Sequence, residues 1–388
     1  MKSKLAEWFK GIFPALVTPF TSEDRIDEAA YRELIRFVLP HVNGVVPCGT
    51  TGEFSSMSMD EKKLAIRFCI DEVAGQVPVL AGTGCQSTRE TLELTGWAKE
   101  AGADGALVVA PYFLKPSYNE VYDHYKQVDR VGLPLVLYNI PQCAGTHYKW
   151  WTAEGMGLAF ENVIGMKDSS GDMPFFMAAL EKLRGTIRLF VGHDEVVGAA
   201  LLAGADGAIL ASANLIPDVW QEIYQAAQRG DREFVQQRQR EIQILTRLVV
   251  RKGGPQAVKE GLRMIGVTGM SNVRLPLMQG GEFEREDYED LRSQLENLGK
   301  IRTQRVRLDG TEVEYALPAD LAPELQDLTM CVGEGFAGPP FSEVAHIDLL
   351  LGRSDGPVGR AIERARRERR PGQEAAIICK HPLTTVSY

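Results

Sequence analysis

The sequence predicts an α/β protein: a (β/α)8 TIM barrel with a helical appendage after it and a small α+β segment at the C-terminus. Short apolar runs bounded by glycine or proline alternate with helical patterns, as they do in parallel sheets that are buried on both faces. There are eight such runs, the number of strands that closes this barrel. The motif Ala-Gly-Ala-Asp-Gly-Ala occurs at Ala101–Ala106 and again at Ala203–Ala208, where a glycine-capped helix would lead into a strand.

The elements follow one another in a steady order. The expected strands are Gly11–Phe20, Gly44–Cys48, Pro78–Gly82, Gly105–Pro111, Pro134–Pro141, Val163–Lys167, Ile187–Gly192 and Gly207–Ala211. Helical spacing of apolar residues predicts helices at Asp27–Leu39, Met59–Val73, Thr88–Ala101, Pro217–Arg229 and Glu233–Val250. Three helical patterns after the eighth strand, with a break at Gly253–Pro255, would form the appendage. A doubly wound open sheet is the alternative, but no Gly-x-Gly-x-x-Gly motif follows the first run.

The character of the sequence changes after residue 299. Arg302–Tyr315 alternates polar and apolar residues around Asp309-Gly310, which predicts a strand pair with a tight turn. The expected domains are the barrel with its terminal helices at 8–299, a linker at 300–331 and a small unit at 332–388. Within the small unit we expect a strand at Val344–Leu351, a helix at Val358–Arg370 and a strand at Ala375–Cys379. Because so few elements make a thin core, this unit is expected to need a partner or a dimer for stability.

Composition indicates a soluble globular protein, with 44% hydrophobic and 24% charged residues among 388. A formal net charge of −9 argues against a surface that binds nucleic acid. The six cysteines are scattered without zinc spacing, which predicts reduced thiols and no metal site. The N-terminus carries no apolar run typical of a signal peptide, and no stretch is long enough to span a membrane. We therefore expect a cytoplasmic protein.

Lys167 is the first candidate for catalysis, because the active site of such a barrel lies at the carboxyl ends of its strands. It follows the apolar run Val163–Met166 and precedes polar, turn-forming residues. Burial against an apolar strand disfavours a charged amine, and a neutral amine forms Schiff bases with carbonyl groups. The alternative is a surface lysine at a strand end, paired with Asp168.

Other polar residues also fall at expected strand ends. Gly49–Glu53 offers backbone amides and two threonine hydroxyls, which suit a small anion such as a carboxylate; a tight β-turn is the alternative. Tyr138 could transfer a proton through its phenol, or could simply pack with its hydroxyl in water. His193 is a further candidate, with a structural role beside Asp194 as the alternative.

An amine, a phenol and a carboxylate-binding turn at the strand ends of one barrel predict a class I aldolase. The lysine would condense with a 2-oxo acid, the turn would hold its carboxylate, and the tyrosine would shuttle the proton. This chemistry requires no metal and no cofactor. The expected ligands are a small 2-oxo acid and an aldehyde, with no nucleic acid or membrane as partner.

Residues from about Trp8 to Gly299 resemble the dihydrodipicolinate synthase / N-acetylneuraminate lyase family. The matching motifs, in the order of the family, are Gly49-Thr50-Thr51-Gly52-Glu53, Tyr138-Asn139-Ile140-Pro141, Gly165-Met166-Lys167-Asp168 and Gly204-Ala205-Asp206-Gly207-Ala208-Ile209. The resemblance implies a Schiff-base lyase that acts on pyruvate or a related 2-oxo acid. It also implies a homotetramer.

The resemblance assigns roles to individual residues. It implies that Lys167 is the Schiff-base lysine, that Tyr138 is the acid and base, and that Thr50 relays protons to Tyr138. Thr51 and its neighbouring amides would hold the pyruvate carboxylate. The implied substrate-binding residues are Thr51, Gly49, Gly52 and Ile209.

Two positions depart from the pattern of the family. Phe113 stands where dihydrodipicolinate synthases place a second tyrosine of the proton relay, donated across a dimer. Cys143 stands where they use an arginine to bind the carboxylate of the aldehyde, and a thiol cannot replace a guanidinium fork. These departures argue against true dihydrodipicolinate synthase activity and favour another pyruvate aldolase or a 2-oxo-acid dehydratase.

The tail, from about 332 to 388, resembles the first part of formaldehyde-activating enzyme. The motifs are Gly333-Glu334-Gly335, Glu343-Val344-Ala345-His346-Ile347-Asp348-Leu349 and Gly352-Arg353-Ser354-Asp355-Gly356-Pro357-Val358-Gly359. The resemblance implies that His346 is a general acid and that tetrahydromethanopterin is a possible substrate of the tail. His346 beside Asp348 could equally be a packed or salt-linked residue. Because only the front part of that family is matched, the tail could instead serve in oligomerisation or interaction.

Two further hypotheses stay open beside the Schiff-base lyase. One is a binding or regulatory barrel that does not turn over. The other is a bifunctional protein whose tail has a working pterin site. If the tail bears on the reaction of the barrel, the aldehyde would be formaldehyde or another small aldehyde.

Overall fold

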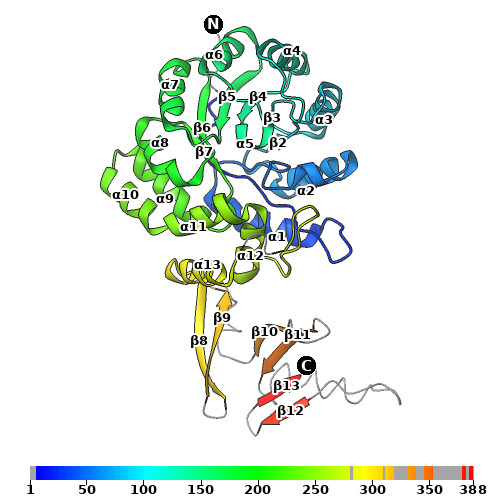
Figure 1. The fold of residues 1–388 in the computed structure, drawn as a ribbon, viewed down its shortest axis with the longest axis vertical. Coiled ribbons are helices and arrows are strands. Elements are labelled where there is room, and N and C mark those ends of the chain that lie inside the picture. The colour runs from blue at the N-terminus through cyan, green and yellow to red at the C-terminus, as the bar shows by residue number, and fades with distance from the viewer. Residues whose placement is uncertain are drawn as a thin grey trace. The chain divides into compact units, whose positions relative to one another are not determined.

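The computed structural model describes residues 6–279 and 283–301 with their side chains. Beyond them it describes the backbone of 302–308, 311–318, 330–337, 345–352, 378–381 and 384–387. The chain divides into two compact units, Met1–Gln294 and Leu295–Tyr388. The first unit contains the barrel, whose strands are enclosed by helices (Figure 1).

Seven parallel strands form one sheet in the order β1-β7-β6-β5-β4-β3-β2. They are β1 Gly11–Pro14, β2 Leu80–Gly82, β3 Gly105–Val109, β4 Leu135–Asn139, β5 Val163–Asp168, β6 Arg188–Val191 and β7 Gly207–Leu210. Nearly every residue in them is buried, as expected for strands covered on both faces. Each overlaps an apolar run from which the sequence predicted a strand.

The expected strand Gly44–Cys48 closes the barrel, but not as a regular strand. Val46 bridges Ala15 on one side and Val45 bridges Val79 on the other, both in parallel. These bridges join the two outer strands of the sheet, β1 and β2, so the ring has eight members. The segment stays short because Cys48 already adopts a left-handed backbone, with φ +58°, and turns the chain away.

Helices follow the strands and continue into the appendage. They are α1 Glu28–Val38, α2 Met59–Val73, α3 Thr88–Ala101, α4 Tyr118–Asp129, α5 Pro141–Ala144, α6 Trp150–Ala159, α7 Met173–Leu183, α8 Val197–Ala203, α9 Pro217–Gln228, α10 Arg232–Glu241, α11 Gln243–Arg247, α12 Pro255–Met264 and α13 Arg285–Asn297. The expectation of a single helix at Glu233–Val250 is wrong. The segment is divided into α10, α11 and a π-helical turn at Leu248–Gly253. The expected break follows, where Gly254 has φ +45° and α12 begins with proline.

The repeated motif has the expected function in both copies. Gly102 ends α3 and Gly204 ends α8 in the left-handed region, with φ +96° and +107°, where glycine carries no steric penalty. The aspartate two residues later then binds back to the sheet: Asp104 accepts from the amide of Val79 at 2.8 Å. Asp206 accepts from Leu189 N at 2.9 Å in the same way.

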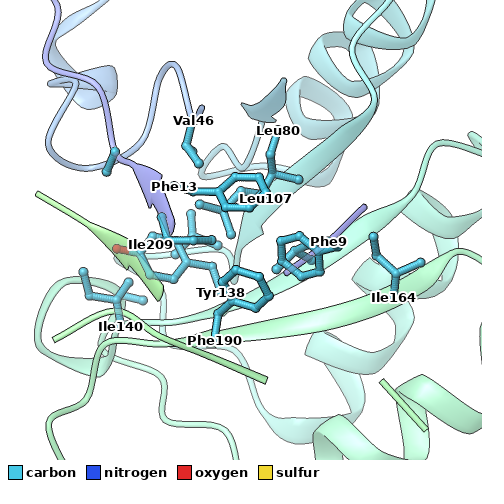
Figure 2. Packing of buried hydrophobic residues seen from close by; sticks show 14 residues of the cluster. Phe9, Phe13, Val46, Leu80, Leu107, Tyr138, Ile140, Ile164, Phe190 and Ile209 are labelled. Carbon is cyan, nitrogen blue, oxygen red and sulfur yellow. The ribbon is translucent and has the colours of Figure 1, made fainter. Parts of the chain in front are cut away.

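Aromatic side chains fill the barrel around β1 and β6 (Figure 2). Phe9 and Phe190 stack with their ring centroids 4.0 Å apart, and Phe13 meets both rings edge-on. The same buried cluster reaches Tyr138 and Ile209. The interior of the barrel is therefore a packed core and not a channel.

The second unit is antiparallel. β8 Ile301–Leu308 pairs with β9 Thr311–Pro318 in the register Leu308↔Thr311, so the expected strand pair is confirmed within the stretch expected as a linker. A second sheet has the order β10-β11-β13-β12. Its strands are β10 Met330–Ala337, β11 Ala345–Gly352, β12 Ile378–His381 and β13 Thr384–Ser387.

Other expectations for the tail have mixed outcomes. The strand expected at Val344–Leu351 is confirmed as β11, in which His346 lies opposite Phe336. The strand expected at Ala375–Cys379 overlaps β12 in its last two residues. The helix expected at Val358–Arg370 lies outside the described residues. The expected domain bounds stay predictions.

Candidate active site

Lys167 and Tyr138 meet inside the barrel. They are register partners on the adjacent strands β5 and β4. Lys167 Nζ donates to Tyr138 Oη at 3.2 Å and lies 4.3 Å from the centroid of the tyrosine ring. Each residue is only 5% exposed, so the alternative of a surface lysine is wrong. The structure thus brings together the amine and the phenol that were expected to do chemistry.

Thr50 extends this pair to a third polar group. Its Oγ1 lies 3.4 Å from Tyr138 Oη, and either hydroxyl can be the donor. Thr50 belongs to the turn Gly49–Glu53, here called the threonine turn, in which Gly52 N donates to Gly49 O and Glu53 N donates to Thr50 O, both at 3.0 Å. A proton can therefore move between Thr50, Tyr138 and the lysine through groups already in contact.

Asp168 does not pair with the lysine beside it. One of its carboxylate oxygens accepts from Asn139 Nδ2 at 2.6 Å and the other from Ser170 Oγ at 2.9 Å. Burial raises the pKa of Asp168, and these hydrogen bonds oppose the rise. The side chain of Asn139 also accepts from Tyr148 N at 3.1 Å. This carboxylate therefore ties the end of β5 to β4.

Gly192, at the end of β6, makes the space that the lysine occupies. A Cβ at this position would lie 2.5 Å from Lys167 Cε and 2.2 Å from Ser169 Oγ, closer than such atoms can approach. The sequence placed Gly192 at a strand end but gave no sign of this role. A glycine in a strand indicates a close approach, but the neighbour that approaches is identified only by the fold.

His193 and Asp194, whose adjacency suggested a structural role for the histidine as one alternative, interact electrostatically, but no hydrogen bond joins their side chains among the described residues. Asp194 is buried and accepts from Ser212 N at 2.9 Å and from the Ser212 hydroxyl. Burial raises its pKa, while the positive charge of Lys167 opposes the rise. His193 Nδ1 has no hydrogen-bond partner among the described residues. Asp194 is therefore a buried carboxyl group within electrostatic reach of Lys167.

The remaining expected residues lie at different depths. Ile209 is fully buried in the core cluster with Tyr138 (Figure 2). Phe113 is 87% exposed in the connection between β3 and α4. Cys143, in α5, is exposed, yet partial desolvation raises the pKa of its thiol and the charge of Lys167 opposes the rise. Cys143 thus lies within electrostatic reach of the amine.

The described residues show neither a cluster of metal ligands nor a helix that could span a membrane. Among the residues with described placement, no three histidine, cysteine, aspartate or glutamate side chains gather as metal ligands. In the same part of the chain, none of the helices has the length and apolar character needed to cross a membrane.

Comparison with known proteins decides the family. The model of the dihydrodipicolinate synthetase family matches residues 8–298. The chain belongs to this family. It is 37% identical over 272 residues to 4-hydroxy-tetrahydrodipicolinate synthase of Nitratidesulfovibrio vulgaris (strain DSM 19637 / Miyazaki F), covering 70% of this chain and 92% of that protein. It is 36% identical over 296 residues to the same-named protein of Methanopyrus kandleri, covering 75% and 97%.

Solved structures agree with this assignment. The dihydrodipicolinate synthase of Acinetobacter baumannii, complexed with pyruvate, superposes with a TM-score of 0.71 at 34% identity, covering 75% of this chain and 99% of that one. YagE of E. coli K12, a prophage protein of the dihydrodipicolinic acid synthase family in complex with pyruvate, gives a TM-score of 0.70 at 30% identity, covering 75% and 98%. The barrel fold is therefore that of the family.

Family membership confirms part of what the sequence suggested. The expectation of a lyase that forms a lysine Schiff base is confirmed. The argument from Phe113 and Cys143 against synthase activity gains no support, because the relatives carry the synthase name. The family match ends at residue 298, so it says nothing of a formaldehyde-activating tail.

Proposed function

We propose that Lys167 forms a Schiff base with pyruvate or a closely related 2-oxo acid, and that the resulting enamine adds to an aldehyde. The contact between Lys167 Nζ and Tyr138 Oη carries this proposal, because an imine-forming amine needs an acid and base within hydrogen-bond reach. Two relatives of known structure, in complex with pyruvate, support the choice of 2-oxo acid.

The steps follow from the groups in contact. Lys167 Nζ adds to the C2 carbonyl of pyruvate, and the carbinolamine loses water to give the imine. Tyr138 carries protons to and from the oxygen that leaves, with Thr50 as relay. Loss of a proton from C3 gives the enamine, whose C3 attacks the aldehyde carbon, and water then releases the product from the lysine. The amides and Thr51 hydroxyl of the threonine turn would hold the carboxylate of pyruvate.

We propose that the aldehyde carries no carboxylate group that the protein would have to bind. Cys143 supplies a thiol where an arginine would bind a carboxylate, and Phe113 supplies no hydroxyl. A neutral aldehyde loses nothing at such a position, whereas a charged one loses a bidentate partner. Turnover with a neutral short-chain aldehyde and with a carboxylate-bearing amino aldehyde separates this proposal from the synthase activity in the names of the relatives. Faster turnover of the carboxylate-bearing aldehyde would overturn it.

Borohydride trapping tests the Schiff base directly. The protein is incubated with pyruvate and borohydride, and the intact mass and the modified peptide are determined, with Lys167→Ala as the control. The expected result is one reduced pyruvate adduct on Lys167 and none in the variant. A folded protein without an adduct would instead favour the binding or regulatory barrel.

The role of the tail stays a prediction, as do the homotetramer and the cytoplasmic location. A bifunctional protein would bind a tetrahydropterin and would lose that binding in His346→Ala. An interaction module would leave tetrahydropterin unbound, and removal of the tail would change the oligomeric state.

A further inference from the structure

We propose that Glu53 and Lys259 are positioning residues: their buried ion pair holds the threonine turn in the shape that receives the carboxylate of the 2-oxo acid. This inference rests on the proposed function, since it takes the turn Gly49–Glu53 as the carboxylate site. The two residues touch no reacting atom. They act through the backbone that carries Thr50 and Thr51.

The last residue of the turn has an unfavourable backbone conformation. Glu53 has φ +57° and ψ +34°, the left-handed region that is sterically unfavourable for a residue with a side chain. Such a conformation persists only where the surroundings over-determine it. The amide of Glu53 donates to Thr50 O at 3.0 Å, so the conformation of Glu53 also fixes the threonines. What holds Glu53 therefore shapes the turn.

Two partners hold the Glu53 carboxylate, and both come from the C-terminal appendage. Oε1 lies 2.6 Å from Lys259 Nζ of α12, with the two side chains 0% and 2% exposed. Oε2 accepts from the backbone amide of Arg274 at 2.9 Å. Lys259 Nζ also donates to Asn272 O at 2.7 Å and lies 4.1 Å from the ring of Phe20. Among the described residues, both partners of the carboxylate thus belong to the helical appendage.

A second layer fixes these partners in turn. The guanidinium of Arg274 binds Glu61 of α2 at 2.6 Å and Asp24 at 2.9 Å. It also donates to Ser56 O at 3.1 Å and lies 4.2 Å from the ring of Phe20. The network therefore connects the loop after β1, the start of α2 and the appendage around one carboxylate.

Energetics indicate that this pair serves geometry more than stability. Burial lowers the pKa of Lys259 to about 8, although Glu53 opposes that change, so desolvation outweighs the attraction. Buried ion pairs commonly contribute no more stability than apolar residues of the same volume. The short charge contact at Oε1 and the hydrogen bond from Arg274 N to Oε2 nevertheless fix the position of the carboxylate at the end of the turn.

The barrel contains a matched control at its other end. Asp206, before β7, also places one carboxylate oxygen on a cation, Arg188 Nη1 at 2.7 Å. The other oxygen accepts from a backbone amide, Leu189 N at 2.9 Å. Asp206→Asn thus removes the same type of contact as Glu53→Gln, but at the amino end of a strand and away from the threonine turn.

The experiment measures how the trapped adduct on Lys167 depends on pyruvate concentration in the full-length protein. A glutamine side chain has only one acceptor oxygen, so Glu53→Gln removes one of the two contacts, either that to Lys259 Nζ or that to Arg274 N, while Lys259 keeps Asn272 O as a partner. We expect Glu53→Gln and Lys259→Met to raise the half-saturating pyruvate concentration by about ten- to a hundredfold, with the same adduct yield at saturation. Lys259→Arg should restore part of the affinity. Asp206→Asn should lower the melting temperature without changing half-saturation.

Each outcome has one meaning. No adduct in the unaltered protein would overturn the proposed function itself. An adduct there, with unchanged half-saturation in Glu53→Gln, would overturn the positioning role alone. Equal shifts in Glu53→Gln and Asp206→Asn would reduce the effect to general loss of stability and would also overturn it. If Lys259→Met does not fold, Glu53→Gln decides.

Discussion

Glycines lie inside the barrel at both ends, and the space that they leave is filled in two different ways. Near the amino ends of the strands, Gly165 makes room for an aromatic ring, because a Cβ there would lie 2.5 Å from Phe9 Cε1. That ring stacks on Phe190. Near the carboxyl ends, Gly192 makes room for Lys167 Cε, also 2.5 Å from a Cβ at that glycine.

A glycine that leaves space for a neighbouring side chain therefore serves packing at one end and chemistry at the other. Phe9 and Phe190 are fully buried rings, which contribute burial of apolar area and nothing that reacts. Lys167, Tyr138 and Thr50 keep polar groups in contact, at a cost in desolvation that packing alone would avoid. Substitutions at the two ends should consequently separate stability from catalysis.

The largest effect is expected for Tyr138→Phe. The ring keeps its place in the core, but the amine loses its only tyrosine hydroxyl among the described contacts, so proton transfer slows. General acid–base catalysis contributes roughly 10²–10⁴-fold, and the rate of adduct formation at saturating pyruvate should fall by that factor while urea unfolding changes little. A rate within threefold of the unaltered protein would assign the proton transfer to another group.

Phe9→Ala should have the opposite effect: it should lower stability and leave pyruvate binding unchanged. Loss of a fully buried ring that stacks on Phe190 is expected to lower the free energy of unfolding by about 3–5 kcal/mol, with half-saturating pyruvate unchanged. Urea unfolding measures the first and borohydride trapping the second. Leu158→Ala is the control, because Leu158 is 66% exposed and its loss should change stability by less than about 0.5 kcal/mol. A large change in pyruvate affinity would contradict the separation of the two ends.

These contrasts show how far the sequence leads. The eight apolar runs and the repeated Ala-Gly-Ala-Asp motif were sufficient to predict the barrel. The spacing of apolar residues, and the glycines and prolines that bound each run, are local properties of the chain. Lys167 and Tyr138 could be paired because strand ends of a parallel sheet lie at one edge. The family resemblance added Thr50, which the structure brings within 3.4 Å of Tyr138.

The contacts that could not be predicted from the sequence join residues far apart in the chain. Glu53 and Arg274 are 221 residues apart, and no local pattern signals that an amide of one will meet a carboxylate of the other. The space beside Gly192 depends on how β5 and β6 align. The hydrogen bonds of Asp194 go to Ser212 rather than to the adjacent His193, because the fold and not chain proximity places the donor.

Gly192→Ala tests the space that this glycine leaves for Lys167 at the carboxyl ends of the strands. The added methyl would push the lysine away from the phenol, and a misplacement of about 1 Å can cost roughly 10²-fold in rate. The rate of adduct formation should therefore fall toward that factor. Gly96→Ala is the control, because nothing lies within 4 Å of a Cβ there. Equal rates for the two variants would show that the lysine side chain can adopt another rotamer without loss.

The smallest effect on stability is expected from a change of pH. It should occur at the carboxyl ends of the strands, where ion pairs surround the threonine turn, and not at the amino ends, where apolar rings pack. Hydrogen bonds from Arg274 hold the pKa of Glu61 at about 2, below its ordinary value of 4.5. Because this pKa is lowered in the folded protein, the stability it contributes is complete above about pH 4.5 and is lost as pH falls toward 2. For a partly exposed pair that contribution is about 1 kcal/mol.

Unfolding free energies measured between pH 2 and 7 test this difference. The curve for Glu61→Gln should lie below that of the unaltered protein at neutral pH and should converge with it in acid, because the variant has no carboxylate to protonate. The curve for Phe9→Ala should keep a constant separation, since apolar packing at the amino end involves no proton. If Glu61→Gln also stays parallel down to pH 2, the ionic network around the threonine turn contributes no pH-dependent stability, and the carboxyl end is held by packing as the amino end is.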